Sequence, residues 1–267
     1  MISIIISSYQ PTFFAALEKN IAETIGVPYE IVQIYNPGTM GICEAYNKGA
    51  AKANFEQLLF LHEDVLFETQ NWGAILCNQM QQGNVGVIGV AGCSYVPNVP
   101  FAWWDLFPAS FKNLKQYNKN RLVSQFSLKD DKTVMALDGV FLACRKEIWR
   151  KFPFNEKISG FHGYDIDFSV RVAYDYDNIV TSKIIISHFS MGNMDEKWLR
   201  SLIETRGYFK KPKGQMINKK YEYFYYTKLK TYLEQFNFPD TEKGMILNKY
   251  NNPRYIGYKA FLKNLTS

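Results

Sequence analysis

The sequence predicts an α/β fold, with a three-layer α/β/α arrangement, a mostly parallel central sheet and a helical C-terminal extension. Two observations predict this class. Apolar runs of strand length alternate with stretches of helical length through the first 90 residues, and turn residues separate them. The 267 residues are 47% hydrophobic and 21% charged, which suits one large globular domain with an appendage and excludes a disordered chain. Strict alternation implies right-handed crossovers with helices on both faces of the sheet.

The elements of the first half follow one another closely. Residues 2–7 form a continuous apolar run with β-branched side chains, which predicts a buried parallel strand. A turn at Gln10 and Pro11 leads into a helix expected over residues 12–25, which Gly26 and Pro28 close. The next expected elements are a strand at 30–35, a turn at 36–38, a helix at 42–53, a strand at 57–61, a helix at 72–82 and a strand at 85–90.

The alternation loosens after residue 90. Residues 92–133 contain three prolines and a Trp pair, and we expect a long excursion over the site rather than a new domain. The next expected elements are short strands at 134–137 and 140–144, helices at 146–152 and 164–174, and a strand at 179–187 that ends at His188. From Lys197 onward the chain is expected to be mainly helical, with breaks at Gly207, Pro212, Pro239 and Pro253.

The charge is unevenly distributed along the chain. Residues 196–267 hold 15 Lys and Arg against 6 Asp and Glu, a net of +9, although the whole chain carries only +6. We therefore expect an α/β domain over 1–192 and a basic, aromatic-rich helical extension over 193–267 packed on it. The aromatic run at 221–226 could contact a membrane peripherally, or pack on the domain or another subunit, which we favour. No recognisable nucleic-acid-binding motif accompanies the basic residues, so no nucleic-acid partner is expected.

Cellular location is predicted from the absence of sorting signals. No apolar run approaches the roughly 18 residues that span a bilayer. A signal peptide begins with basic residues, and here no Lys or Arg precedes Lys19. The four cysteines are dispersed and form no C-x-x-C pair, so neither a zinc site nor a disulfide framework is indicated. We expect a cytoplasmic protein, with contact at the inner face of the membrane left open.

The predicted strand ends locate the functional site. In parallel sheets, ligands bind at the carboxyl ends of the strands. These ends carry Ser8 and Tyr9, then Tyr35 and Asn36, then the only acidic cluster among them, residues 62–64. Hard divalent ions prefer carboxylate oxygens and often bridge to substrate phosphates, so the cluster predicts a metal site, although Asp64 could instead cap a helix.

A second acidic cluster opens the helix expected at 164–174. Asp165 and Asp167 follow Gly163, and first-turn carboxylates are favoured by the helix dipole even without a catalytic role. The alternative is that one of them is a general base, and their spacing lets only one face the pocket. All three histidines stand at strand ends or beside carboxylates, which favours a role in the site: His62, His162 and His188.

Several blocks of sequence occur in a characteristic order. They cover residues 4–9, 41–49, the acidic strand end near residue 60, 138–149 and 164–171. Their order and spacing resemble a family 2 glycosyltransferase of the GT-A fold, over roughly residues 1–192. The resemblance implies a nucleotide-sugar donor, a glycan or lipid-linked acceptor, and a divalent cation, Mn²⁺ or Mg²⁺.

The resemblance also implies roles for individual residues. Asp64 matches the last acid of the D-x-D motif and, with His188, would hold the metal, whereas Asp165 would be the base. The residues implied to line the nucleotide are Ser8, Tyr9, Asn36, Asn47, His62 and Glu63. Those implied to face the donor or acceptor sugar are Trp103, Trp104, Asp138, Gly139 and His162. Direct displacement with deprotonation of the acceptor hydroxyl would invert the anomeric carbon.

The sequence departs from the family pattern at three positions. His62 replaces the first acid of D-x-D, Asn36 stands where an acid often reads uracil, and Tyr164 replaces the first acid of the E-D pair. Two alternatives therefore stay open: a non-catalytic protein of this fold that binds glycan or nucleotide sugar, and a metal-dependent hydrolase. A glycosidase would need two carboxylates roughly 5–10 Å apart across the scissile bond, for which Asp64 and Asp165 are the candidates.

Overall fold

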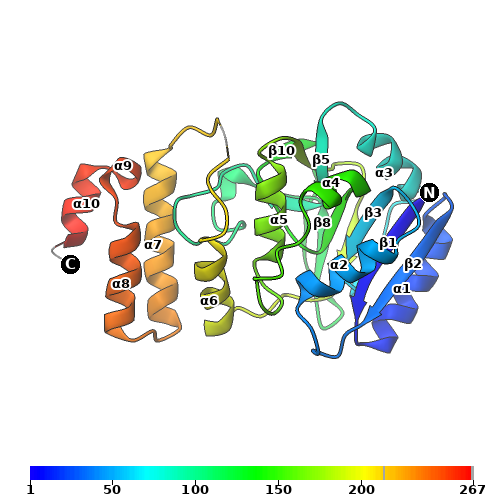
Figure 1. Cartoon of the computed structure of the whole chain (residues 1–267), viewed down its shortest axis with the longest axis horizontal. Helices are drawn as coiled ribbons and strands as arrows, with labels where there is room; N and C mark the ends of the chain where they lie inside the picture. The colour runs from blue at the N-terminus through cyan, green and yellow to red at the C-terminus, as the bar shows by residue number, and fades with distance from the viewer. Residues whose placement is uncertain (213, 266–267) are drawn as a thin grey trace.

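The structure, a computed structural model, describes residues 1–212 and 214–265. Its centre is a seven-stranded sheet, and Figure 1 shows the helices that surround it. The strand order across the sheet is β10 (Lys132–Val134), β13 (Asp177–Val180), β5 (Val85–Gly89), β12 (Phe141–Arg145), β3 (Gln57–Leu61), β1 (Ile2–Ser8) and β2 (Tyr29–Tyr35).

The sheet is mostly parallel, as the sequence predicts. β1 pairs in parallel with β2 and β3, and β5 pairs in parallel with β13. The exceptions are β12, which runs antiparallel between β3 and β5, and β10 at the edge. Because β12 is antiparallel, its beginning pairs with the end of β3, Phe141 opposite Leu61. The turn at residues 138–140 therefore lies at the carboxyl ends of the parallel strands.

Helices cover both faces of the sheet, and β1 shows why. Its alternate residues enter two separate core clusters, Ile4 and Ile6 in one and Ile5 in the other, as the two-residue period of a strand requires. The cluster of Ile4 includes side chains of α1 (Pro11–Thr24) and α3 (Trp72–Met80). The cluster of Ile5 includes side chains of α2 (Ile42–Lys52), α4 (Lys146–Lys151) and α5 (Tyr164–Val172). The three-layer prediction is thus confirmed.

Two smaller sheets accompany the central one, and all of their strands except one follow residue 90. One contains β11 (Ala136–Leu137), β6 (Ala91–Cys93) and β7 (Ser110–Lys112). The other contains β4 (Val65–Phe67), β14 (Ile186–His188), β8 (Leu114–Asn118) and β9 (Arg121–Gln125). The 92–133 excursion therefore contains several short paired strands, with a short 3-10 turn, η1 (Phe107–Ala109), before β7.

Two strand predictions are wrong in detail. The run 179–187 is not one strand, because β13 ends in the central sheet and β14 belongs to a different sheet. The chain turns away between them, where the Asp131 carboxylate accepts hydrogen bonds from the backbone N–H and hydroxyl of Ser182, both at 2.8 Å. The strand expected at 134–137 is likewise split at Met135, whose N–H donates to the carbonyl of Cys93.

The C-terminal helices form the end of the molecule opposite β1 and β2 (Figure 1). They are α6 (Glu196–Thr205), α7 (Lys219–Gln235), α8 (Asp240–Tyr250), α9 (Pro253–Ile256) and α10 (Tyr258–Leu265). Aromatic rings of α7 pack edge-on against the segment that precedes η1: Tyr221 on Tyr95 at 5.3 Å and Tyr225 on Phe101 at 5.7 Å. Among the residues that the structure describes, none of the helices has the length and apolar character needed to cross a membrane.

Candidate functional site

A cavity of about 800 Å³ opens at the carboxyl ends of β1, β2 and β3. The residues that directly follow these strands, Tyr9, Asn36 and His62, all line it. The structure brings ten of the residues singled out in the sequence to its wall: Tyr9, Asn36, His62, Trp103, Trp104, Asp138, Gly139, His162, Asp165 and His188.

Beside the cavity, His62, Asp64 and His188 form a cluster whose potential ligand atoms lie within 4.8 Å of one another. Asp64 Oδ1 is 3.6 Å from His188 Nε2 and 3.9 Å from His62 Nδ1, too far for hydrogen bonds. The β4–β14 pairing explains the approach, because His188 lies opposite Val65, next to Asp64. A small sheet that the sequence did not predict thus brings His188 next to two residues that are distant from it in the sequence.

The second nitrogen of each imidazole has its own partner. His62 Nε2 lies 2.9 Å from the hydroxyl of Tyr164, and His188 Nδ1 lies 3.3 Å from Gln116 Oε1. The Gln116 amide is held in turn, since its Nε2 donates to the carbonyls of His188 and Ser190. A carbonyl oxygen can only accept, so Gln116 holds the proton on His188 Nδ1 and leaves a lone pair on Nε2.

These features fit a bound divalent cation. His188 Nε2 is buried and has no hydrogen-bond partner, and burial lowers the pKa of His188, which favours the neutral ring that binds metals. Outer hydrogen bonds to ligating histidines are the usual arrangement at metal sites. Two imidazoles and one carboxylate suit Mn²⁺ and other transition ions better than Mg²⁺, which prefers an all-oxygen set.

A pair of carboxylates faces the cavity next to this cluster. Asp165, in the first turn of α5, accepts a 2.9 Å hydrogen bond from the backbone N–H of Gly139. Asp138 accepts from the Val140 N–H at 2.8 Å with one oxygen and from the Trp103 indole at 2.9 Å with the other. Burial, reinforced by the negative charge of Asp138, raises the pKa of Asp165 to about 7. Asp165 can therefore both accept and hold a proton near neutral pH.

Gly139 is required by close packing. A Cβ on this residue would lie 2.0 Å from the hydroxyl of Tyr164, the group that contacts His62. Tyr164 stands where the family motif has an acid, and in the structure it connects the Asp138–Gly139 turn to the histidine cluster. In the sequence, Tyr164 is a departure from the motif with no role of its own, and nothing distinguishes Gln116 from the other polar residues of the 92–133 excursion.

Aromatic residues form another part of the cavity wall. Trp103 is almost fully buried, with its ring edge-on to Trp104 at 5.6 Å. Trp104 stacks on Trp198 of α6 at 6.0 Å, so the extension contributes to the cavity. His162 also lines the wall, and burial lowers its pKa.

Four predicted nucleotide-binding residues use their polar atoms within the protein. Asn36 lines the cavity, but its amide oxygen accepts from Thr39 and Met40 and its nitrogen donates to Ser7 and Met40. The Ser8 hydroxyl accepts from Gln33, and the buried Glu63 carboxylate accepts from the N–H groups of Tyr9 and Gln10 at the start of α1. Neither Ser8 nor Glu63 lines the cavity.

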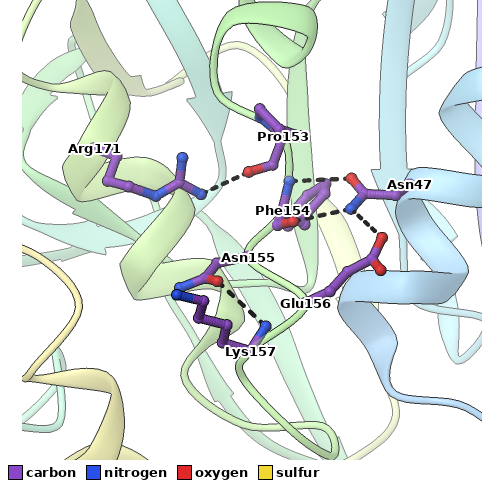
Figure 2. A pocket seen from close by; sticks show the side chains of 7 residues that line it. All are labelled: Asn47, Pro153, Phe154, Asn155, Glu156, Lys157 and Arg171. Carbon is purple, nitrogen blue, oxygen red and sulfur yellow. Dashed lines mark hydrogen bonds between the residues drawn. The ribbon is translucent and has the colours of Figure 1, made fainter.

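Asn47, the fourth, lies in a separate open depression between α2 and α5 (Figure 2). Its amide oxygen accepts from Trp149 Nε1 and the Phe154 N–H, both at 3.0 Å. Its nitrogen donates to the Phe154 carbonyl and to Glu156. Asn47 therefore fixes the loop after α4. It does not line the cavity beside the cluster of His62, Asp64 and His188.

Three comparisons with known proteins place this geometry in context. Residues 3–211 match the model of a glycosyltransferase-like family. No curated protein matches the sequence. Two similar solved structures are GalNAc-T7 with UDP, GalNAc and Mn²⁺ (11% identity, TM-score 0.59), and the mannosyltransferase PcManGT from Pyrobaculum calidifontis with GDP-Man and Mn²⁺ (12% identity, TM-score 0.53).

These structural likenesses establish the fold. All of this chain aligns with 56% of the GalNAc-T7 chain, so it spans little more than half of that protein, and 94% aligns with 73% of PcManGT. The architecture is the GT-A fold, as the sequence blocks predict.

Proposed function

Because the chain belongs to the glycosyltransferase-like family, we propose that it transfers a sugar from a nucleotide-sugar donor to a hydroxyl of a glycan or lipid-linked acceptor. The observation that carries the proposal is the cluster of His62, Asp64 and His188, which adjoins the cavity that Asp165 lines. The two neighbours described above contain Mn²⁺ with a nucleotide or nucleotide sugar, which supports the same ligand class here.

In the proposed reaction, the residues that would hold a divalent cation are His62, Asp64 and His188. A bound divalent cation would offset the negative charge that develops on the diphosphate leaving group. Tyr164 and Gln116 orient the two imidazoles through their second nitrogens, so that the ligand atoms need not reorganise when the donor binds.

Asp165 is the proposed base. Its near-neutral pKa suits it to take the proton of the acceptor hydroxyl as the new glycosidic bond forms. The Gly139 N–H fixes the orientation of the carboxylate. Attack by that hydroxyl on the face opposite the diphosphate inverts the anomeric carbon, and inversion is part of the proposal.

The test is ligand-induced thermal stabilisation. Wild-type protein is screened against nucleoside diphosphates and nucleotide sugars, each with and without Mn²⁺, because a ligand of the folded state raises the melting temperature. We expect a shift that requires Mn²⁺ and disappears in Asp64→Asn. Asp130→Asn, which removes an exposed carboxylate outside the cavity, is the matched control and should keep the shift. A metal-independent shift, or one that survives Asp64→Asn, contradicts the proposal.

A binding protein without transfer activity is the second candidate. Asn36 and Glu63 favour it, because both have committed their polar atoms to neighbouring backbone. Nucleoside diphosphate release from the donor identified in the screen separates the two candidates. Release that depends on Mn²⁺ and is lost in Asp165→Asn supports the transferase, and its absence with a bound donor and a broad set of acceptors supports the binding protein.

A further inference from the structure

One positively charged side chain in the cavity has no role in the mechanism above. Lys112, the last residue of β7, lines the wall near the tryptophans. Within residues 1–212 and 214–265, it is the only Lys or Arg that lines this cavity. Its ammonium group makes no hydrogen bond or ion pair with any described residue, so its hydrogen-bonding capacity is open to a ligand.

The Lys112 side chain is held between two aromatic rings. Its Nζ lies 5.3 Å from the centroid of Trp103 and 4.9 Å from that of Phe126. Both distances are within the range of cation–π attraction. Phe126 and Leu114 add apolar surface to this part of the wall, and burial lowers the pKa of Lys112. A partly desolvated charge of this kind attracts a counter-charge more strongly than a surface lysine does.

The nearest acidic group does not neutralise Lys112. The negative charge of Asp138 offsets part of the lowering of the Lys112 pKa that burial causes. No Asp138 oxygen, however, lies within ion-pair distance of Nζ. Both Asp138 oxygens already accept hydrogen bonds, from Trp103 and from Val140. Asp138 also acts on His188 and Asp165, so its charge is shared among several groups rather than committed to Lys112.

We propose that Lys112 forms a subsite for an anionic sugar, binding a carboxylate or phosphate group carried by the donor or acceptor saccharide. The inference rests on the proposed transferase function and names its substrate class. The diphosphate belongs with the His62, Asp64 and His188 cluster, so the anion at Lys112 is a second one on the substrate. Elsewhere along this wall Asp138 and Asp165 repel an anion, so the subsite also sets the orientation of the sugar.

The test compares sugars that differ only in charge. For the acceptor, the affinities of glucuronate and glucose 6-phosphate are compared with that of glucose by calorimetry. For the donor, UDP-glucuronate is compared with UDP-glucose in the presence of Mn²⁺. We expect the anionic member of at least one arm to bind about tenfold more tightly, the size expected for a hydrogen bond to a charged group. The arm that shows the preference identifies whether the anion belongs to the acceptor or to the donor.

Three variants assign the preference. Lys112→Met keeps an unbranched stem between the rings without the charge, and should abolish the preference while leaving the affinity for the neutral sugar unchanged. Lys112→Arg should retain much of it. Lys129→Met, which removes an exposed lysine outside the cavity, should behave as wild type. Neutral sugars that bind as tightly as anionic ones, or an equal loss for both in Lys112→Met, would overturn the subsite.

The same data separate the two proposals. If UDP-glucose binds with Mn²⁺ and is lost in Asp64→Asn, but no charge preference appears, the transferase proposal stands and the subsite is rejected. If free anionic sugars bind through Lys112 while no nucleotide sugar binds, the subsite stands and the donor proposal is rejected. If no sugar of either arm binds, and no nucleotide sugar in the thermal screen binds with Mn²⁺, both are rejected.

Discussion

The imidazoles of His62 and His188 show how single hydrogen bonds prepare a ligand set. Each ring presents one nitrogen toward Asp64, because the other is engaged by Tyr164 or by Gln116. The two supporting residues come from α5 and β8, which are distant in sequence from both histidines. Which nitrogen faces the cluster is therefore decided by tertiary structure. The sequence predicted Asp64 and His188 as the metal ligands and assigned His62 to the nucleotide, whereas the structure places His62 beside them.

At the same scale, Asp165→Asn tests the base. An amide cannot take a proton from the acceptor, so we expect kcat to fall by about 10² to 10⁴, the usual contribution of a general base. In the wild type the base must be ionised, so the rate should fall as the pH drops through the pKa of Asp165, about 7. Steady-state kinetics from pH 5.5 to 8.5 measure both effects. A variant with wild-type kcat, or a rate with no acidic limb near pH 7, would exclude Asp165 as the base.

The raised pKa of Asp165 also has a consequence for stability. The folded value, about 7, lies above the unfolded value of about 3.9, so the folded state binds more protons between them. The wild type therefore loses stability as the pH rises from about 4 to 7, by up to about 4 kcal/mol for a shift of about 3 units. Asp165→Asn lacks this loss. Urea unfolding at pH 5 and pH 8 measures this. The free energy of unfolding of Asp165→Asn, relative to that of the wild type, should be higher at pH 8 than at pH 5. The same relative value at both pH values would refute the pKa shift.

At the scale of secondary-structure elements, the turn between β11 and β12 joins the two halves of the site. Asp138 contacts Trp103, the Gly139 N–H contacts Asp165, and the Val140 carbonyl accepts from the His62 N–H. This position follows from the antiparallel direction of β12. One turn therefore fixes the tryptophan wall, the proposed base and the first histidine relative to one another.

Gly139→Ala tests that turn. The added methyl group would overlap the Tyr164 hydroxyl, so Tyr164 must move and release His62. We expect Mn²⁺ affinity to fall by about 10-fold to 100-fold, as is typical when an outer partner of a ligating histidine is lost. Titration of Mn²⁺ in the presence of nucleotide measures this.

The control for that variant is Gly244→Ala on the exposed face of α8, where a Cβ meets no atom within 4 Å. It should keep the Mn²⁺ affinity and stabilise the helix by about 1 kcal/mol. Unchanged Mn²⁺ affinity in Gly139→Ala would show that Tyr164 does not position His62.

The elements of the first half were predictable because their signals are local. The apolar runs of β1 and β3, and the turn residues between them, need no information from elsewhere in the chain. The direction of β12 and the separation of β13 from β14 depend on distant partners, such as the Asp131 carboxylate that turns the chain at Ser182. A strand-like pattern across 179–187 cannot reveal that its two ends belong to different sheets.

The site was predictable to a similar extent. Position at a strand end was enough to select His62 and Asp64, and Asp165 was selected as a carboxylate that opens an expected helix and matches the family motif. These signals were not enough to show that Asn47 is fully hydrogen-bonded to a loop more than 100 residues away, or that Lys112 faces the same cavity. Whether a polar side chain is free for a ligand depends on partners that only the folded chain reveals.

At the scale of the whole molecule, the extension is attached through a buried polar network. Glu222 of α7 is fully buried, and it pairs with Lys211 and accepts from the Tyr95 hydroxyl and the Asn98 N–H. Farther along α7, Tyr232 donates to Asp105 at 2.7 Å. These bonds hold both ends of the segment that carries Trp103 and Trp104, so α7 supports the aromatic wall of the cavity.

Glu222→Gln tests the attachment. Without the carboxylate, the Lys211 ammonium loses its counter-charge in a largely buried position, and we expect the free energy of unfolding to fall by about 3 kcal/mol. Urea denaturation measures the loss. The double variant Lys211→Met, Glu222→Gln removes the unpaired charge and should recover part of it. Wild-type stability in Glu222→Gln alone would show that the network contributes nothing to the attachment.

The network between Tyr95 and Glu222 also has a consequence for biosynthesis. The two residues are separated by 127 positions, so a ribosome translating at about 5–20 residues per second reaches the second on the order of 10 s after the first. During that interval β1 to β3 are already available to pair, whereas the segment bearing the two tryptophans still lacks its partner helix. The pairing of β1 to β3 can therefore form while the chain is being made, whereas the aromatic wall of the cavity must wait for α7 to be synthesised.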